Sequence, residues 1–500
     1  MAGYLKRLIS SLAAYQVADV ISKLIAVLLL PVYTRFVQPS GYGVVELLAN
    51  GVILASILVR FGMIESFLRY YYTDGDADAD ADADAERRDA LVRRAAGFLL
   101  LTTTVAAAVL AAFAGPVSRI VLGYRDATTM LIAVLGLWSF TNLELAYGVL
   151  RVDERLRLYA TASIVNVGLT VAASVVLVVG LGDGARGLLL GNYGATTVVL
   201  VALWVVLRPR LTRRTTRGES MRTLMRFGLP TVPAEASVYA LSIVDRYYIF
   251  HDRSPALAGL YSIAVKLAGA VAFVVRAFQY AWPPLAYSVS DDREAGRLYG
   301  LVTTYYLLVC GWIVAGLALG GRWVLRLLAA PAFFGAWRAL PWVALGWALY
   351  GLWVVFLVIA GRAKVTTRNF PASLVGLAVN VALLFVLVPS IGLAGAGIAL
   401  CGAYVAMLGV MHLLTRRAFP VAFEWGRLAR LVIVVGGLAV AGDLALPTSG
   451  FPGLIERVLV WAAIPPALLA TGFAHPEELR RAQALLDRAR ARGSRTGSGA

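Results

Sequence analysis

Long apolar segments recur along almost the whole of this 500-residue chain, and they constrain its fold more than any other feature. A helix needs about 20 apolar residues to cross a bilayer, and we identify about fourteen such segments. A backbone in lipid must satisfy its own hydrogen bonds, so each segment is predicted to be a helix. The expected spans lie near residues 10–33, 43–66, 95–115, 128–150, 157–181, 186–207, 228–250, 256–282, 299–320, 339–360, 370–389, 393–414, 428–446 and 455–473.

The overall composition supports an all-α polytopic membrane protein. Hydrophobic residues make up 60% of the chain and charged residues 15%, whereas soluble domains carry about 25% charged residues. The sequence contains no phosphate-binding loop, zinc-protease motif or nucleophile elbow. Its two cysteines, Cys310 and Cys401, lie inside expected spans, and its three histidines lack ligand spacing. We therefore predict no catalytic residue, no metal site and no cofactor, and a protein that is not an enzyme.

The basic residues predict how the chain is oriented in the membrane. The net charge is +17, which by itself could indicate nucleic-acid binding. With fourteen spans and an internal N-terminus, 32 of the 46 lysines and arginines fall on the cytoplasmic side and 9 outside. This bias predicts a multi-pass protein of the cytoplasmic membrane with both termini cytoplasmic. The charge then indicates contact with anionic inner-leaflet lipids and no nucleic-acid partner.

Two segments of the chain resemble each other. Tyr159–Tyr193 and Phe370–Tyr404 each contain an apolar run with a central asparagine, a glycine-rich break and a second apolar run. A single alignment pairs Asn166 with Asn380 approximately, and pairs Gly184 with Gly395, Gly191 with Gly402 and Tyr193 with Tyr404. Two like halves are typical of transporters whose bundles rock about a site between them. The alternative is similar hydropathy without duplication.

The repeat and the charge distribution predict the organisation of the chain. The expected parts are an N-terminal six-helix bundle (1–207), a cytoplasmic Arg-rich linker (208–227), a C-terminal six-helix bundle (228–415), two further membrane helices (416–474) and a basic cytoplasmic tail (475–500). The Asp-Ala run Asp74–Asp84 has no apolar residue larger than alanine, so we expect a solvated loop there. A role for this loop in binding divalent cations is a weaker alternative.

Three local signals predict where helices begin and end in the second half. Ser254-Pro255 places an N-cap before a proline at the first helical position, so a helix should start there. Pro230 and Pro233 predict an irregular first turn for the preceding helix. Pro283-Pro284 is expected to stop the helix that begins at Pro255.

Several stretches, taken in their order, carry a family resemblance. They are Leu30–Gly43 (LPVYTRFVQPSGYG), Phe61–Tyr71 (FGMIESFLRYY), Phe227–Pro230 (FGLP), Asp245–Ile249 (DRYYI), Gly259–Lys266 (GLYSIAVK), and Asn380 followed by Gly392–Gly397 (GLAGAG). Together, over about residues 10–415, they resemble the Wzx-type polysaccharide flippases. Those belong to the multidrug/oligosaccharidyl-lipid/polysaccharide exporter superfamily, which also holds lipid II flippases and multidrug antiporters.

This resemblance implies a fold and a function. It implies two pseudo-symmetric six-helix bundles that form a V-shaped cavity and work by alternating access. It also implies transport of a polyprenyl-diphosphate-linked oligosaccharide for surface polysaccharide, such as the O-antigen of lipopolysaccharide. A polysaccharide polymerase and glycosyltransferases are its implied protein partners.

Four cations inside the spans are candidate substrate-binding residues, because charges at membrane depth are costly and usually functional. They are Lys23, Arg60, Lys266 and Arg276. Lipid II flippases carry cavity-facing cations on the same helices, and a diphosphate needs such compensation. Two alternatives stay open: Lys23 can form a structural pair with Asp19, and Arg60 can reach the headgroups by snorkelling.

Acidic residues bear on the rival functions. Asp19 and Glu144 are the deeper acids and the candidates for ion coupling, whereas Glu46 and Glu65 lie near helix ends, where solvent or headgroups should reach them. Asp245-Arg246 is expected to be a self-neutralising pair. An H⁺- or Na⁺-coupled multidrug-type antiporter would need such acids unpaired. A polytopic glycosyltransferase or polymerase would need a long catalytic loop outside the membrane, and no expected outer loop is long enough.

Overall fold

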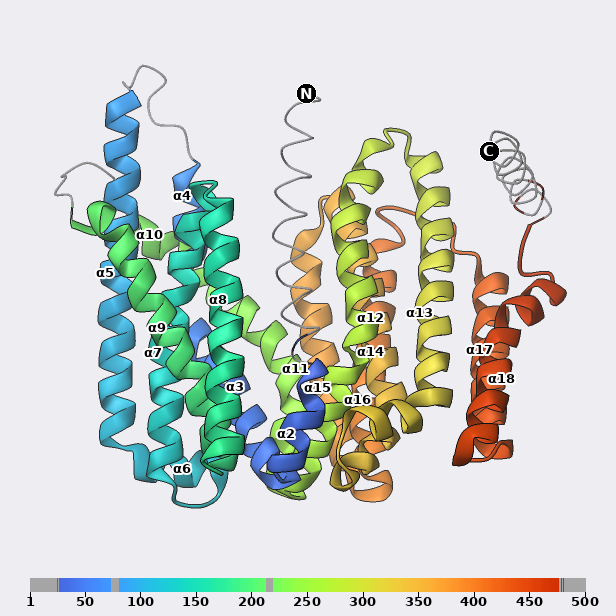
Figure 1. Ribbon diagram of the computed structural model, residues 1–500. Coiled ribbons are helices and arrows are strands. Elements are labelled where there is room, and N and C mark those ends of the chain that lie inside the picture. Colours follow the sequence, from blue (N-terminus) through green and yellow to red (C-terminus); the bar gives the residue numbers. More distant parts are fainter. Residues whose placement is uncertain are drawn as a thin grey trace, which may run out of the picture. The chain divides into compact units, whose positions relative to one another are not determined.

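The computed structural model describes residues 25, 27–72, 81–212, 219–475, 478 and 480, and within them the secondary structure is helical, without strands (Figure 1). Among the described residues, twelve helices are long and apolar enough to cross a membrane, or up to thirteen if the bent pair Met221–Leu241 and Ile243–Asp252 is one span. The expected all-α polytopic fold is confirmed. The first expected span, 10–33, lies mostly outside the described residues, and so does most of the basic tail 475–500.

The chain forms two compact units. Unit 1 consists of Met1–Leu267, Leu325–Ala339 and Phe370–Ala403, and unit 2 of Ala268–Val324, Leu340–Asn369 and Tyr404–Ala500. The two six-helix bundles expected from the repeat stay a prediction.

Unit 1 is built on neighbouring helices that pack along their length. Its elements are α2 (Leu30–Phe36), α3 (Pro39–Val59), α4 (Met63–Tyr71), α5 (Ala81–Ala112), α6 (Ala114–Leu122), α7 (Ala127–Val152), α8 (Leu156–Val175), the π-helix η1 (Val176–Gly180), α9 (Gly184–Thr212), α10 (Met221–Gly228), the 3-10 helices η2 (Leu229–Thr231) and η3 (Pro331–Arg338), α11 (Val232–Asp252), the start of α12 (Pro255–Ser288), most of α15 (Asn369–Ile391) and the start of α16 (Leu393–Thr415). The helix α9 packs on α7 and α8, and α3 packs on both α7 and α11. Phe67, Leu99 and Leu200 are fully buried in the core between α4, α5, α7 and α9.

Unit 2 contains the rest of α12 and α16 together with α13 (Asp292–Leu328), α14 (Leu340–Arg362), η4 (Thr366–Arg368), α17 (Trp425–Ala445) and α18 (Gly450–Ala470). The last two helices lie side by side (Figure 1). Val435, Ile464 and Leu468 of this hairpin pack with Ala315 of α13 in one core cluster. The rings of Trp312 on α13 and Trp461 on α18 stack with centroids 4.2 Å apart.

Two of the three local signals in the second half are confirmed. The helix α12 begins at Pro255, and the Ser254 hydroxyl accepts a hydrogen bond from the Leu257 N–H at 3.2 Å. The 3-10 helix η2 covers Pro230, which gives α11 the expected irregular entry. The stop at Pro283-Pro284 is wrong, because α12 continues through both prolines to Ser288. Carbonyls freed by proline in a membrane helix can be satisfied by neighbouring groups, so proline need not end it.

The predicted loop of the Asp-Ala run is wrong for its last residues. The helix α5 begins at Ala81, and the Asp84 carboxylate pairs with Arg87 at 3.2 Å and Arg88 at 2.7 Å. Alanine favours helix, and acidic residues in a first turn interact well with the helix dipole. Residues 73–80 lie outside the described part of the chain.

Each copy of the internal repeat folds as a helical hairpin, α8–α9 in the first copy and α15–α16 in the second. One aligned pair of glycines, Gly191 and Gly402, has the same role in both copies. The other pair differs, because a Cβ atom on Gly184 would contact no described residue, whereas one on Gly395 would overlap the Leu387 carbonyl. A Cβ atom added to Gly191 would collide with Ser174 of α8, and one added to Gly402 would collide with Leu383 of α15. Small residues at these positions let the two helices of each hairpin approach closely. Superposition of the two bundles stays a prediction.

Candidate functional site

One face of α3 meets α11 and the start of α12 inside unit 1, and polar contacts follow this face from end to end. We call it the α3 seam; it comprises Gly43, Glu46, Asn50, Arg60 and Gly62 on one side and Gly228, Glu235, Arg246, Gly259 and Lys266 on the other. Glu46 and Asn50 lie one helical turn apart on the same face. The seam contains two of the four predicted substrate-binding cations.

The first end of the α3 seam is a reciprocal contact between two glycines. A Cβ atom on Gly43 would overlap the Pro255 carbonyl oxygen, and one on Gly259 would overlap the Pro39 carbonyl oxygen. In both helices the glycine therefore lies one turn after a proline and receives the backbone of the other helix. Any side chain at Gly43 or Gly259 would force α3 and α12 apart.

The second end of the α3 seam repeats this arrangement. Gly62 and Gly228 approach so closely that a Cβ atom on either would overlap the carbonyl of the other. Phe61 and Gly62 both have positive φ values, 48° and 70°, and they break the chain between α3 and α4. The Ser66 hydroxyl then donates to the Leu224 carbonyl at 2.7 Å. The Phe-Gly pairs of two resemblance motifs, far apart in sequence, thus meet in space.

Lys266 lies between these ends and is already compensated. Its ammonium nitrogen is 2.7 Å from Glu46 Oε1 and donates to the Tyr42 hydroxyl at 2.6 Å. The same nitrogen lies 4.9 Å from the centroid of the Tyr42 ring. The Glu46 side chain is only 14% exposed, so the expectation that solvent or headgroups reach it is wrong. Glu46 is near a helix end in sequence, but it faces the neighbouring α12.

Arg60 is the second cation of the α3 seam and is 7% exposed. Its Nη2 lies 3.1 Å from Glu65 Oε1 and also pairs with Glu235 on α11. The alternative that Arg60 snorkels to the headgroups is therefore wrong. Within the described part of the chain, three buried atoms of this cluster, Arg60 Nε, Glu65 Oε2 and Glu235 Oε2, have no hydrogen-bond partner. The cluster keeps capacity for another polar group.

The middle of the α3 seam contains residues that the sequence analysis did not select. Asn50 Oδ1 accepts hydrogen bonds from the Tyr239 hydroxyl at 3.1 Å and from Arg246 Nη1 at 3.0 Å. Asp245 accepts from the Tyr261 hydroxyl at 2.5 Å. Asp245 and Arg246 attract each other, as expected of a self-neutralising pair. The expectation was incomplete, because each residue also binds another helix. The four-residue spacing of Glu46 and Asn50 places both on one face of α3, and it was the sequence signal that could have indicated this part of the site.

A cavity of about 300 Å³ adjoins Lys266, enclosed by α2, α3, α8, α9 and α12. Polar residues of its lining include Tyr33, Glu46, Asn166, Asn192 and Lys266. Asn166 Oδ1 is buried and has no hydrogen-bond partner in the part of the chain that the structure describes, and an unsatisfied buried acceptor is costly. The cavity therefore offers an acceptor and an ion pair to a polar ligand.

The other predicted site residues lie elsewhere or outside the described chain. Lys23 and Asp19 are among the residues that the structure does not describe. Arg276 is exposed on α12 in unit 2. Glu144 is half-buried on α7 and interacts electrostatically with Arg151 and Arg60. The described residues contain no cluster of three or more His, Cys, Asp or Glu that could hold a metal ion.

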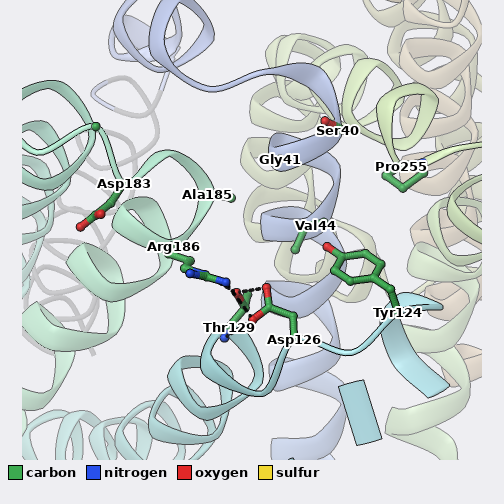
Figure 2. A pocket seen from close by; sticks show the side chains of 11 residues that line it. Ser40, Gly41, Val44, Tyr124, Asp126, Thr129, Asp183, Ala185, Arg186 and Pro255 are labelled. Carbon is green, nitrogen blue, oxygen red and sulfur yellow. Dashed lines mark hydrogen bonds and ion pairs between the residues drawn. The ribbon is translucent and has the colours of Figure 1, made fainter. Parts of the chain in front are cut away.

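A second, more open cavity of about 520 Å³ lies at the end of unit 1 where α3 and α12 begin (Figure 2). We call it the Asp126 pocket; it is lined by Ser40, Gly41, Val44, Tyr124, Asp126, Thr129, Gly182, Asp183, Ala185, Arg186 and Pro255. Burial by itself would raise the pKa of Asp126, but hydrogen bonds from Thr129 and Arg186 outweigh it and lower the pKa. Asp126 is therefore a stable carboxylate beside a guanidinium.

Comparison with known proteins gives a family and a fold. A family model described as "Polysaccharide biosynthesis protein" matches residues 8–286. No curated protein matches the chain in sequence. Among solved structures, the lipid II flippase MurJ in an inward closed conformation has a TM-score of 0.70 at 13% identity, over 93% of this chain and 100% of that one.

Two solved transporters of the multidrug type are also similar. An inward-facing multidrug resistance MATE family transporter of the MOP superfamily has a TM-score of 0.63 at 14% identity, over 80% of this chain and 98% of the other. A mutant of the Vibrio cholerae MATE transporter VcmN has a TM-score of 0.52 at 13% identity, over 82% and 94% of the two chains. At these identities the likeness shows the fold alone.

Proposed function

Since the chain belongs to the polysaccharide biosynthesis protein family, we propose that it is a flippase for lipid-linked oligosaccharides. It moves a glycan joined to polyprenyl diphosphate from the inner to the outer leaflet of the cytoplasmic membrane, for surface polysaccharide assembly. The two halves, 1–207 and 228–415, alternate access to the substrate. Glycosyltransferases that build the glycan and a polymerase that extends it act before and after this step. The protein itself is not an enzyme.

The observation that carries this proposal is the pair of compensated cations in the α3 seam. Lys266 lies within the span Pro255–Ser288, where a charge is costly unless it serves a function. Lys266 is held by Glu46, and Arg60 by Glu65 and Glu235. A diphosphate presents anionic oxygens of the same kind as these carboxylates, so it can take their place at both cations.

This exchange would couple substrate binding to opening of the α3 seam. Lys266 belongs to the second half of the chain and Glu46 to the first, whereas Arg60 belongs to the first half and Glu235 to the second. Both ion pairs therefore join the two halves. A ligand shifts a conformational equilibrium only by binding one state better. A diphosphate binds better where the carboxylates have withdrawn, and so it favours the opened seam.

The charge distribution supports an orientation with both termini cytoplasmic. The seam end at Gly62 and Gly228 then faces the cytoplasm, because the basic segment 208–227 adjoins it in sequence. The end at Gly43 and Gly259 faces outward. Substrate enters past the cytoplasmic end from anionic inner-leaflet lipid and leaves past the outer end.

The rival function is an H⁺- or Na⁺-coupled antiporter, which the MATE-type folds keep open. Such a protein needs carboxylates that are free to exchange a cation for a cationic drug. In the α3 seam, Glu46 and Glu235 are each bound by a cation of the protein itself. This charge arrangement favours an anionic substrate. Asp19 and Glu144 remain the candidates for coupling to an ion gradient.

Reconstitution in liposomes tests the proposal directly. Vesicles would contain an undecaprenyl-diphosphate-linked oligosaccharide with a fluorophore on its sugar, and a membrane-impermeant quencher would report the fraction in the outer leaflet. We expect the protein to accelerate exchange between leaflets relative to protein-free vesicles, and not to export ethidium under an H⁺ or Na⁺ gradient. Gradient-driven ethidium export without movement of the lipid-linked sugar would establish the antiporter instead.

A further inference from the structure

The Asp126 pocket lies at the opposite end of α3 from Arg60. Ser40 and Gly41 are in the first turn of α3, whereas Arg60 is the C-cap residue at its other end. Twenty residues of helix separate them, which corresponds to about 30 Å. The pocket is therefore separate from the cations that the proposed function assigns to the diphosphate, although both belong to unit 1.

The polar wall of the Asp126 pocket is fixed by its own hydrogen bonds. Asp126 caps α7, accepting from the Thr129 N–H at 3.1 Å and from the Thr129 hydroxyl at 2.6 Å. Arg186 Nη2 donates to Asp126 Oδ1 and Nε to the Thr129 hydroxyl, both at 3.1 Å. A guanidinium has five N–H donors, so these two bonds leave three. The Arg186 side chain is 55% exposed, which makes them accessible.

An aromatic ring completes the Asp126 pocket opposite this wall. Tyr124 is 45% exposed, and Figure 2 shows its hydroxyl directed toward the space that Arg186 and Asp126 face. Ser40 adds a hydroxyl from α3. A half-exposed tyrosine offers an apolar face together with a polar tip. The volume of about 520 Å³ is in the range of small-molecule sites.

The mixture of groups selects one ligand chemistry. A bare phosphate would be repelled by Asp126 and Asp183, and a metal ion by Arg186. Sugar hydroxyls both donate and accept, so they can use the Arg186 donors and the Asp126 and Asp183 acceptors together. The C–H face of a pyranose ring can pack on Tyr124. We propose that the Asp126 pocket is a saccharide-binding site that holds sugar residues of the glycan on the outer side.

This inference rests on the proposed function for its sidedness and its ligand. It adds a binding site for the sugar portion, apart from the cations for the diphosphate. Ser40 and Gly41 of α3 and Pro255 of α12 line the pocket, and Pro255 also contacts Gly43 in the glycine crossing. Sugar in the pocket therefore lies against the two helices that close the outer end of the α3 seam.

A binding experiment tests the site without transport. The probe is the oligosaccharide released by mild acid from the host's lipid-linked intermediate, which lacks both lipid and diphosphate. Saturation-transfer NMR would measure its binding to the full chain in nanodiscs. We expect Tyr124→Ala and Arg186→Gln each to weaken binding at least about tenfold. Arg430→Gln, at an exposed arginine outside the pocket, should leave binding within about twofold. Asp126→Asn retains the helix cap and should weaken binding while folding is preserved.

The outcomes separate this site from the flippase function. Equal binding by wild type, Tyr124→Ala and Arg186→Gln, or no binding by folded wild type, overturns the saccharide site even if lipid-linked glycan still crosses the liposome membrane. If sugar binding depends on Tyr124 but no lipid-linked glycan crosses the liposome membrane, the saccharide site is supported and the flippase proposal is overturned. Cys310 and Cys401 are buried, so Asp183→Cys can be labelled selectively. Labelling of intact cells by an impermeant maleimide supports the outer placement, and labelling only after lysis overturns it.

Discussion

Arg60 at the end of α3 and Arg457 in α18 are both buried arginines next to carboxylates, yet their hydrogen bonding differs. Arg457 is 1% exposed. It donates to Asp443 and to four backbone carbonyls, those of Leu319, Asp443, Leu446 and Pro447, at 3.0–3.3 Å. Its guanidinium also lies 5.5 Å from the centroid of the Trp323 ring. Every direction around Arg457 is occupied by unit 2 itself.

Arg60 has carboxylates on two sides but keeps unused capacity. Its Nε and one oxygen each of Glu65 and Glu235 are buried and have no hydrogen-bond partner among the described residues. Leaving such atoms unsatisfied costs about 1–3 kcal/mol each. Burial and charge alone therefore do not identify a functional cation. A cation whose donors are all used, mostly by backbone carbonyls, stabilises the fold, whereas one held by a few exchangeable carboxylates can change partners.

The largest effect should come from Lys266, the other exchangeable cation of the α3 seam. Lys266→Met should abolish transport, by at least about a hundredfold, because it removes an anion-binding charge and leaves Glu46 buried and unpaired. Lys266→Met/Glu46→Gln should restore membrane abundance and the thermal midpoint but not transport. Complementation of an export-deficient strain at matched protein abundance measures transport, and thermal unfolding of the purified protein measures the midpoint. Recovered transport in the double variant would show that Lys266 only supports the fold.

Arg457→Met should instead cost stability. The substitution takes a shared donor from carbonyls of α13, of α17 and of the loop that follows α17, and each buried acceptor left unsatisfied costs about 1–3 kcal/mol. We expect a lower thermal midpoint and less protein in the membrane, with unchanged transport per folded molecule. Arg430→Met is the matched control, since Arg430 is exposed and its guanidinium donates to the Gly472 carbonyl. A normal midpoint with lost transport would place Arg457 among the functional cations.

The smallest effect concerns acid stability at the other end of the α17–α18 hairpin. Arg427 lies between Glu424 and Glu478, each 3.0 Å away, and His475 also faces Glu424. Burial alone would raise the pKa of Glu424, but hydrogen bonds from Thr304 and Arg427 lower it below its ordinary value of 4.5, and the pKa of Glu478 is lowered as well.

A lowered carboxylate pKa stabilises the folded state at pH values above the unfolded pKa, and this contribution disappears as pH falls through the folded pKa. The thermal midpoint should therefore be insensitive to these groups between pH 7 and about 5 and fall below about pH 4.5. The variant Glu424→Gln/Glu478→Gln should have a lower midpoint at pH 7 and a shallower acid decline, measured in detergent. Parallel pH curves for both proteins would contradict this role.

Much of the fold could be predicted from the sequence because membrane helices are specified locally. Apolar length, the Ser254 cap and the proline at 255 predicted elements that the structure contains, and the ordered motifs predicted the family. Two local interpretations failed: the first because neighbouring groups can satisfy carbonyls that proline frees, and the second because alanine itself favours helix. Pro283-Pro284 does not end α12, and the Asp-Ala run is helical from Ala81.

The candidate site was only half visible in the sequence. Lys266 and Arg60 stood out because a charge inside an apolar segment is costly wherever the helix packs. Glu46, Asn50 and Arg246 did not stand out, since their importance comes from facing another helix. Position along a helix does not reveal which face is covered, so Glu46 looked accessible although α12 covers it.

Hydropathy and the ordered motifs were enough to predict a helical membrane protein, its family and the two cations of the α3 seam. The carboxylates that hold those cations, and the glycines that close the ends of the α3 seam, became known from the packing of the helices. The two kinds of information differ in the range of the interactions that produce them. Hydropathy and helix capping act within one segment, whereas Lys266–Glu46, Arg60–Glu235, Gly43–Gly259 and Gly62–Gly228 join residues more than 150 positions apart.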